Sequence, residues 1–222
     1  GYVVQIEVVN ESNYGVAKYR ERFFLVAHHL GMSFKFPPPT HGKINQQLCL
    51  FPLQPYLNLG QALAGLGSPS KDKEHPPEDS HLDVTPPGDI KRIHGVPEGS
   101  FLAGEKHLPE QQRGKLTAKD TTKFRRLSFS DPSLTLRCGE IFFHPREDRY
   151  LTPREYMRIH GYPDDYLLKG PIRGRSGTVR HLDQHRQIAN SVPPPVARAI
   201  AAEVAKSLKS QVLASAISAG DR

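Results

Sequence analysis

Arg20 and Arg22 are the side chains whose type and spacing most directly suggest binding chemistry in this sequence. They stand two positions apart, just before the apolar run at residues 23–27, and alternate residues of an extended chain project to the same side. Two guanidinium groups on one side could hold a phosphate or a base edge through paired hydrogen bonds. The alternative is that both are solvated arginines at the start of a strand.

Three later segments place polar residues in well-defined turns. Thr135 follows the turn-forming pair Asp131-Pro132. Residues 152–155 form a capping box, with Pro153 at the first helical position. The run at residues 190–192 precedes three prolines that can start another helix. Each segment also has a purely structural explanation, as a turn, a capped helix and a turn before a helix that starts with proline.

The composition limits the possible classes of protein. Thirty Lys and Arg against 23 Asp and Glu give a net charge of +7, and a basic surface favours phosphate backbones without proving that it binds them. Cys49 and Cys138 are too few for a disulfide framework or a four-cysteine zinc site, so no metal is expected. No apolar run approaches the roughly 20 residues of a membrane span, and no secretory leader is recognisable. We therefore expect no membrane association and a cytoplasmic location.

Two strands are predicted near the start of the chain. Residues 3–9 alternate, with Val4, Ile6 and Val8 on one face. Residues 10–15 have the composition of a turn. The continuous apolar run at residues 23–27 is typical of a strand buried on both faces. Such a pair suits the edge of an α/β sheet.

The rest of the chain divides by its pattern. Residues 57–66 could form a short helix, residues 67–89 read as a linker or long surface loop, and residues 90–143 suggest a small, irregular, mostly β unit. A helix should begin after Thr152, with Leu151 against Tyr156, and end at Gly161. The last helix should follow the prolines at 193–195, and the tail beyond Lys209 should be frayed. The apolar stripe of that helix is Val196, Ile200, Val204 and Leu208.

Four blocks of the sequence, in this order, resemble the last third of the DNA cytosine-5 methyltransferase family. Residues 14–22 resemble its Tyr-Gly-Val-Pro-Gln-x-Arg-x-Arg motif, with Ala17 in place of Pro and Lys18 in place of Gln, and residues 36–42 resemble the segment that follows. Residues 126–136 are similar to Arg-Leu…Pro-Ser-x-Thr-Leu. Residues 149–164 resemble Arg-x-Leu-Thr-x-Arg-Glu…Gly-(Phe/Tyr)-Pro-Asp. Residues 187–194 resemble Gln-Ile-Gly-Asn-(Ser/Ala)-Val-Pro-Pro, with Ala189 in place of Gly.

The resemblance implies roles for particular residues. Arg22 would contact a cytosine flipped out of the DNA, with Arg20 also facing DNA, and the hydroxyl of Thr135 would reach a phosphate. Arg149 and Arg154 would organise the recognition domain or face DNA, without a part in the chemistry. The cofactor would be S-adenosyl-L-methionine. Its amino-acid end would bond Asn190 and Ser191, and Val192 would pack nearby.

The resemblance also implies an architecture. The fold class expected is α/β, the C-terminal part of a Rossmann-like S-adenosylmethionine-dependent methyltransferase domain plus a small, mostly β target recognition domain. Residues 1–58 would end the catalytic domain, 59–143 would hold the linker and recognition domain, 144–209 would return to the catalytic domain, and 210–222 would form the tail.

The catalytic part of the family is not recognisable in this sequence. The family's nucleophile is a cysteine that follows a proline, whereas Leu48 precedes Cys49 and Arg137 precedes Cys138, and no Glu-Asn-Val occurs. We therefore expect part of an enzyme that methylates C5 of cytosine in double-stranded DNA, inactive alone, with the missing region upstream of Gly1. Two alternatives are the DNA-reading subunit of a split methyltransferase, paired with a separate N-terminal catalytic subunit, and a non-catalytic basic DNA-binding protein. The sequence does not indicate which DNA sequence the enzyme would recognise. It also does not indicate whether the enzyme would serve restriction–modification or regulation.

Overall fold

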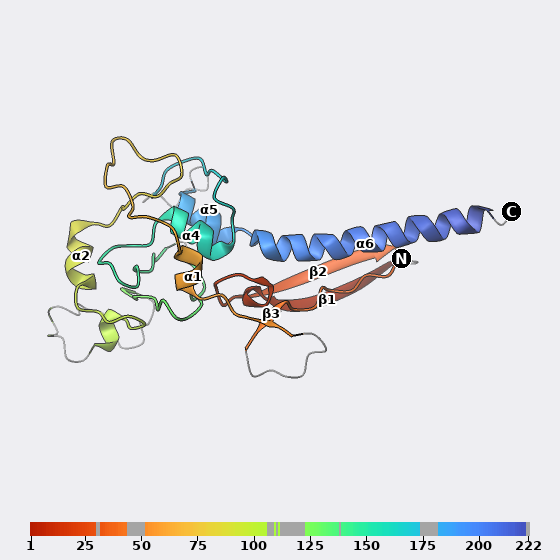
Figure 1. The fold of residues 1–222 in the computed structure, drawn as a ribbon, viewed down its shortest axis with the longest axis horizontal. Helices are drawn as coiled ribbons and strands as arrows, with labels where there is room; N and C mark the ends of the chain where they lie inside the picture. Colours follow the sequence, from red (N-terminus) through yellow and green to blue (C-terminus); the bar gives the residue numbers. More distant parts are fainter. Residues whose placement is uncertain are drawn as a thin grey trace.

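The computed structural model describes residues 1–29, 32–43, 52–105, 109, 111, 123–137, 139–173 and 182–220. Figure 1 shows a body of short helices and long loops, from which a two-stranded ribbon and one long helix extend side by side. The two chain termini lie toward the far end of this extension. The body and the extension meet at the short turn that follows α5 (Gln184–Asn190) and precedes the long helix α6 (Pro194–Gly220).

The ribbon is an antiparallel hairpin of β1 (Tyr2–Asn10) and β2 (Glu21–His29). A 3₁₀ helix, η1 (Glu11–Tyr14), follows β1, because the Asn10 side chain accepts the Ser12 amide and Gly15 takes a left-handed conformation with φ 77°. A glycine adopts that conformation at little cost. Both predicted strands and the predicted turn are confirmed.

Only one face of the hairpin is covered. Phe24 and Val9 pack against Val196 and Ile200 of α6. The opposite side chains, Phe23 and Leu25, are 63% and 53% exposed, so the prediction that residues 23–27 are buried on both faces is wrong for this chain. The apolar run is there, but among the described residues nothing covers its second face. We call this surface the open face; it comprises Tyr2, Val4, Ile6, Val8, Phe23 and Leu25.

Helix α6 continues to Gly220, past the point at Lys209 where the sequence predicted a frayed tail. The continuation has a local cause, since Ala214, Ala216 and Ala219 favour a helix and no proline interrupts the segment. The predicted apolar stripe lies partly against the hairpin, with Val196 fully buried and Leu208 49% exposed.

The body contains short elements joined by loops. They are β3 (His41–Gly42) and β4 (Gln54–Pro55), which pair in parallel, α1 (Leu59–Leu63), α2 (Pro87–Ile93), η2 (Leu102–Gly104), α4 (Pro153–His160) and α5. The short helix expected within residues 57–66 is confirmed as α1.

The prediction of a mostly β unit between residues 90 and 143 is wrong for the described part of that segment. Its β structure is limited to isolated bridges, such as Phe101 with Arg125 and Arg126 with Phe143. The apolar runs are too short and too often broken by turns to form ladders, so side chains hold the backbone instead. Phe143 stacks on Tyr150, with ring centroids 5.3 Å apart, in a small separate apolar cluster.

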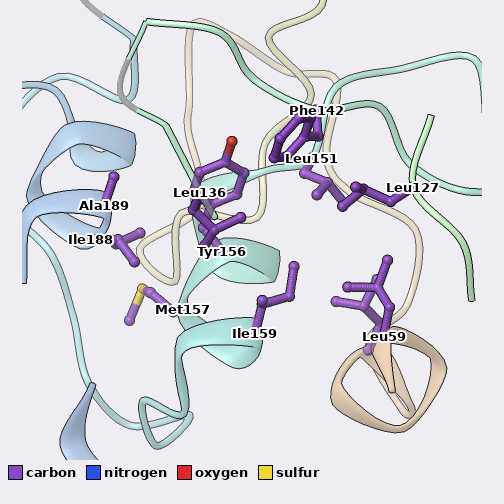
Figure 2. Close-up of a cluster of buried hydrophobic side chains, with 11 residues drawn as sticks. Leu59, Leu127, Leu136, Phe142, Leu151, Tyr156, Met157, Ile159, Ile188 and Ala189 are labelled. Carbon is purple, nitrogen blue, oxygen red and sulfur yellow. The ribbon is translucent and has the colours of Figure 1, made fainter. Parts of the chain in front are cut away.

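Helix α4 is the centre of the body, and its predicted boundaries are confirmed. The Thr152 hydroxyl accepts the Glu155 amide at 3.2 Å, and the Glu155 carboxylate accepts the Thr152 amide at 2.7 Å, which completes the capping box. Gly161 ends the helix with φ 80°. Figure 2 shows the main core around this helix, with side chains from α1, from α5 and from the loops that contain Leu127 and Leu151. Its buried members include Leu59, Leu127, Leu136, Phe142, Leu151, Tyr156, Met157, Ile159 and Ile188.

Gly161 offers a test of how closely the end of α4 packs on the start of α6. A Cβ at this position would lie 2.7 Å from Cγ of Pro195, whereas a Cβ at Gly65, which has nearly the same φ, would meet nothing within 4 Å. We expect Gly161→Ala to destabilise the chain by about 2–5 kcal/mol, the sum of left-handed strain and overpacking. Gly65→Ala is the matched control and should cost only the strain, about 1–2 kcal/mol. Urea unfolding of both variants measures the difference, and equal losses would contradict the close contact.

Candidate functional site

One cavity of about 430 Å³ collects residues from three of the sequence blocks that attracted attention. Arg20 comes from the segment before β2, Thr135 from the loop after the Asp131-Pro132 turn, and Asn190 from the end of α5. Its complete lining is Arg20, Thr135, Leu136, Arg137, Gly139, Glu140, Ala189 and Asn190. Guanidinium, hydroxyl, carboxylate and amide groups in one hollow suit a ligand with phosphate or base-edge hydrogen-bonding groups.

Backbone pairing joins the first two segments. The Tyr19 amide donates to the Ser133 carbonyl at 2.9 Å, and the Ser133 amide donates to the Ala17 carbonyl at 2.8 Å. The Thr135 hydroxyl donates to the Tyr19 carbonyl at 3.0 Å. Thr135 therefore lies beside Arg20, and its hydroxyl proton would have to leave this carbonyl to reach a phosphate.

The two arginines project to the same side, as their alternation predicted, and both reach the turn between α5 and α6. Arg20 Nη1 donates to the Ala189 carbonyl at 2.8 Å. Arg22 Nη2 donates to the Ser191 carbonyl, and Arg22 Nε pairs with the Glu11 carboxylate. Within the described part of the chain, no hydrogen bond is made by the third nitrogen of Arg22, Nη1.

Lys18 and His160 were not assigned a role from the sequence, yet both are completely buried. Lys18 is connected to Arg22 through Glu11, and His160 through the Ser191 carbonyl. Lys18 Nζ lies 2.8 Å from a carboxylate oxygen of Glu11 and 2.6 Å from Nδ1 of His160. Burial lowers the pKa of Lys18 to about 8, although Glu11 opposes the shift. Burial, together with the Lys18 charge, lowers the pKa of His160 to about 2, so that its ring is neutral. The one available signal was that Lys18 departs from the family's glutamine.

The three residues expected at the cofactor occupy the turn between α5 and α6 with different exposures. Asn190 is exposed and lines the cavity. Ser191 is partly buried, and its hydroxyl donates to the Ile188 carbonyl at 2.8 Å. Val192 is 41% exposed and belongs to a separate apolar groove between Phe24 and α6.

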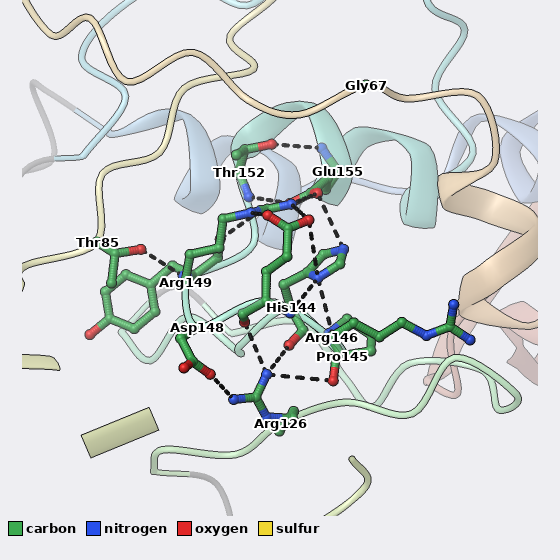
Figure 3. Close-up of polar contacts among 12 residues, drawn as sticks. Gly67, Thr85, Arg126, His144, Pro145, Arg146, Asp148, Arg149, Thr152 and Glu155 are labelled. Atoms are coloured by element: carbon green, nitrogen blue, oxygen red, sulfur yellow. Dashed lines mark hydrogen bonds and ion pairs between the residues drawn. The ribbon is translucent and has the colours of Figure 1, made fainter. Parts of the chain in front are cut away.

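Arg149 and Arg154 are inside the body, with relative exposures of 5% and 2%. Arg149 donates from two nitrogens to the Glu155 carboxylate, at 2.7 and 2.8 Å, as Figure 3 shows. Arg154 donates to the carbonyls of Asp79 and Asp164, at 2.7 and 2.9 Å. The expectation that Arg149 and Arg154 face DNA is therefore corrected, because each guanidinium points into the body of the chain. The organising alternative agrees with the geometry.

Arg126 is a third buried arginine that holds loops together, and sequence reasoning did not assign it this role. It is 5% exposed and donates to the backbone carbonyls of Val96, Ile93, His144 and Glu147, at 2.7 to 3.1 Å. It also pairs with Asp148 (Figure 3). Its signal in the sequence was weak, because an arginine at the start of a loop is usually solvated.

The described residues contain no group of three or more His, Cys, Asp or Glu side chains placed to hold a metal ion. None of the helices they form is long and apolar enough to span a bilayer. Cys49 and Cys138 lie outside the described residues.

The neutral His160 gives a pH prediction. Because its pKa in the folded chain is far below the ordinary 6.5, its contribution to stability is complete above that value and is lost as the pH falls toward 2. Between about pH 7 and about pH 5 the loss should be about 2 kcal/mol. His160→Gln keeps a neutral acceptor for Lys18 and cannot titrate. Urea unfolding at both pH values should therefore show a smaller decline for the variant. Parallel declines would mean that His160 is not held neutral.

Comparisons with known proteins agree with one another. The family model for C-5 cytosine-specific DNA methylases matches residues 1–206. The type II methyltransferase M.NgoFVII of Neisseria gonorrhoeae is 30% identical over 203 residues, which cover 87% of this chain and 47% of that protein. M1.HphI of Haemophilus parahaemolyticus is 27% identical over 209 residues, 93% of this chain and 49% of that protein. This chain thus spans about half the length of these relatives.

A solved structure supports the expected fold class. A protein from E. coli described as a DNA modification methyltransferase encoded within a prophage superposes with a TM-score of 0.59 at 18% identity. The match covers 94% of this chain and 61% of the other. At that identity the likeness concerns the fold alone, and it agrees with part of an α/β methyltransferase. The family model covers nearly the whole sequence. The chain therefore belongs to the C-5 cytosine-specific DNA methylase family.

Proposed function

We propose that this chain is the DNA-reading part, and one wall of the cofactor pocket, of an enzyme that transfers a methyl group from S-adenosylmethionine to C5 of cytosine in duplex DNA. The observation that carries the proposal is the cavity at which Arg20, Thr135 and Asn190 meet. Residues that the family resemblance assigns to DNA and to the cofactor are far apart in the sequence, yet they line one hollow. The net charge of +7 supports a polyanionic substrate.

Arg22 is proposed to contact the cytosine after the base leaves the helix. Two of its guanidinium nitrogens are held by Glu11 and the Ser191 carbonyl, and Nη1 is left to donate to the base. Arg20 and Thr135 are proposed to hold the DNA backbone beside it. Arg149 and Arg154 keep the surrounding loops in place from inside.

The turn at residues 190–192 fits the edge of an S-adenosylmethionine site better than a complete site. S-adenosylmethionine supplies the methyl group. The exposed Asn190 amide can bond the amino-acid end of that molecule, and Val192 offers an apolar contact. The Ser191 hydroxyl already donates a hydrogen bond to the Ile188 carbonyl, so while that bond is kept it offers a ligand only an acceptor. The other walls must come from elsewhere.

We propose that residues 1–58 and 144–209 complete an α/β catalytic domain and that the segment between them reads DNA. The remaining half of that domain would cover the open face of the hairpin. Two observations support this: six apolar side chains are exposed on one surface, and relatives are about twice as long. A contiguous exposed apolar surface commonly marks an interface. The other half could precede Gly1 in the same chain or be a separate subunit, and the names of the relatives suggest a restriction–modification role.

The first test is methyl transfer itself. We expect no methylation of duplex DNA by the chain alone, because neither cysteine follows a proline as the family's nucleophile does. Joining the chain to the region encoded upstream of Gly1, or to a neighbouring subunit, should give transfer of labelled methyl groups to cytosine. In that enzyme Arg22→Ala should lower kcat about 100-fold. Arg198→Ala, an exposed arginine on α6, is the control and should leave kcat unchanged. Methylation by the chain alone, or an active Arg22→Ala enzyme, would contradict the proposal.

The open face gives a second test. Ile6 and Leu25 are cross-strand partners and are 58% and 53% exposed, so replacing both with Asp should lower the stability of the isolated chain by no more than about 2 kcal/mol, through lost strand preference and the repulsion of facing carboxylates. The same double variant should fail to bind the other half, because two carboxylates would be buried in an apolar contact. Leu167→Asp is the control, an exposed leucine away from the hairpin. Sedimentation of the mixed halves measures binding, and unimpaired association of the double variant would exclude this face as the interface.

A further inference from the structure

Five groups, one of them the guanidinium of Arg22, form a closed ring of polar contacts. Lys18 Nζ lies 2.8 Å from Glu11 Oε2, and the other oxygen of Glu11 pairs with Arg22 Nε. Arg22 Nη2 donates to the Ser191 carbonyl, which lies 3.3 Å from His160 Nε2. Nδ1 of His160 returns to Lys18 Nζ at 2.6 Å.

The directions of these bonds follow from chemistry. An ammonium group can only donate, so Nδ1 of His160 must accept, and the imidazole proton is then on Nε2, facing the Ser191 carbonyl. The buried imidazole of His160 is neutral, in agreement with this arrangement. Only Glu11 carries a negative charge in the ring, and both of its oxygens are engaged.

Glu11 is the member on which the ring depends. Its side chain is fully buried, as is that of Lys18, while the Arg22 side chain is 15% exposed. A buried carboxylate is stable only when opposite charges and hydrogen bonds compensate for its lost hydration. Lys18 supplies one such charge at Oε2 of Glu11. Oε1 of Glu11 is then held toward Arg22 Nε. A neutral glutamine at position 18, the family's residue, would not supply that charge.

The ring also joins three segments that are distant in sequence. Glu11, Lys18 and Arg22 come from the hairpin and its connection, His160 ends α4, and Ser191 lies between α5 and α6. The guanidinium of Arg22 is thus held from two sides, by a carboxylate and by a carbonyl. The third guanidinium nitrogen, Nη1, makes no hydrogen bond to the described residues.

We propose that Glu11, anchored by Lys18, is a positioning residue that aims Arg22 at the base, a role that rests on the function proposed above. Neither Glu11 nor Lys18 touches the substrate; each acts through Arg22. In this chain the buried ion pair of Lys18 and Glu11 stands where the family's motif has a neutral glutamine at position 18.

The first experiment examines the chain without activity. In a ¹⁵N-labelled sample, the Nε–H group of Arg22 should give a signal protected from exchange with water, because its proton is bonded to Glu11. Glu11→Gln should lower this protection at least about 10-fold, since a charge-assisted bond is replaced by a neutral one. Glu21→Gln is the matched control, an exposed glutamate beside Arg22, and should retain it. Protection that persists in Glu11→Gln would overturn the proposal.

The second experiment uses the chain joined to its catalytic half. Glu11→Gln and Lys18→Gln should each lower kcat about 10-fold to 100-fold, the effect of a misaimed contact, with KM for S-adenosylmethionine within about two-fold. The decisive variant is Glu11→Gln with Arg22→Ala, which should be no slower than Arg22→Ala alone, because Glu11 acts only through Arg22.

The outcomes separate two failures. Multiplying effects in the double variant would mean that Glu11 has only a general structural role, and would overturn this inference while leaving the proposed function intact. An unsubstituted joined enzyme that does not methylate DNA would overturn the proposed function, and the positioning role with it.

Discussion

The carboxylate of Glu155 is the group on which most of the body depends. It accepts the Thr152 amide that begins α4 and both terminal nitrogens of Arg149, at 2.7 to 2.8 Å. One buried charge thus fixes the start of the central helix and the loop that precedes it. Because a buried carboxylate without these donors would be strongly destabilising, the loop and the helix must form together. The core of Figure 2 then packs on a helix whose first turn is already set.

The two ends of α4 carry out different tasks. Its first turn belongs to the polar network of Figure 3, whereas its last residue, His160, belongs to the ring around Arg22. Gly161 then lets the chain turn away while Pro195 lies against it. Eight residues of helix therefore connect the loops around Arg149 to the polar contacts that hold Arg22.

Local signals in the sequence were sufficient for the hairpin, the turn at Asn10, and the capped helix after Thr152, since each depends on neighbouring residues alone. The separate roles of Arg20, Thr135 and Asn190 were expected from family resemblance, whereas only the structure brings the three to one cavity. What covers residues 23–27 could not be predicted, because an apolar run indicates a tendency to be buried without specifying the partner. The roles of Lys18, His160 and Arg126 depend on contacts between residues far apart in sequence, which composition does not record.

The open face also has a thermodynamic consequence. Whatever polypeptide covers Ile6, Phe23 and Leu25 removes apolar surface from water, and that process has a large negative change in heat capacity. The attraction between the two surfaces therefore weakens on cooling rather than on warming near room temperature. The association of two parts of a protein through this ribbon would therefore become weaker in the cold.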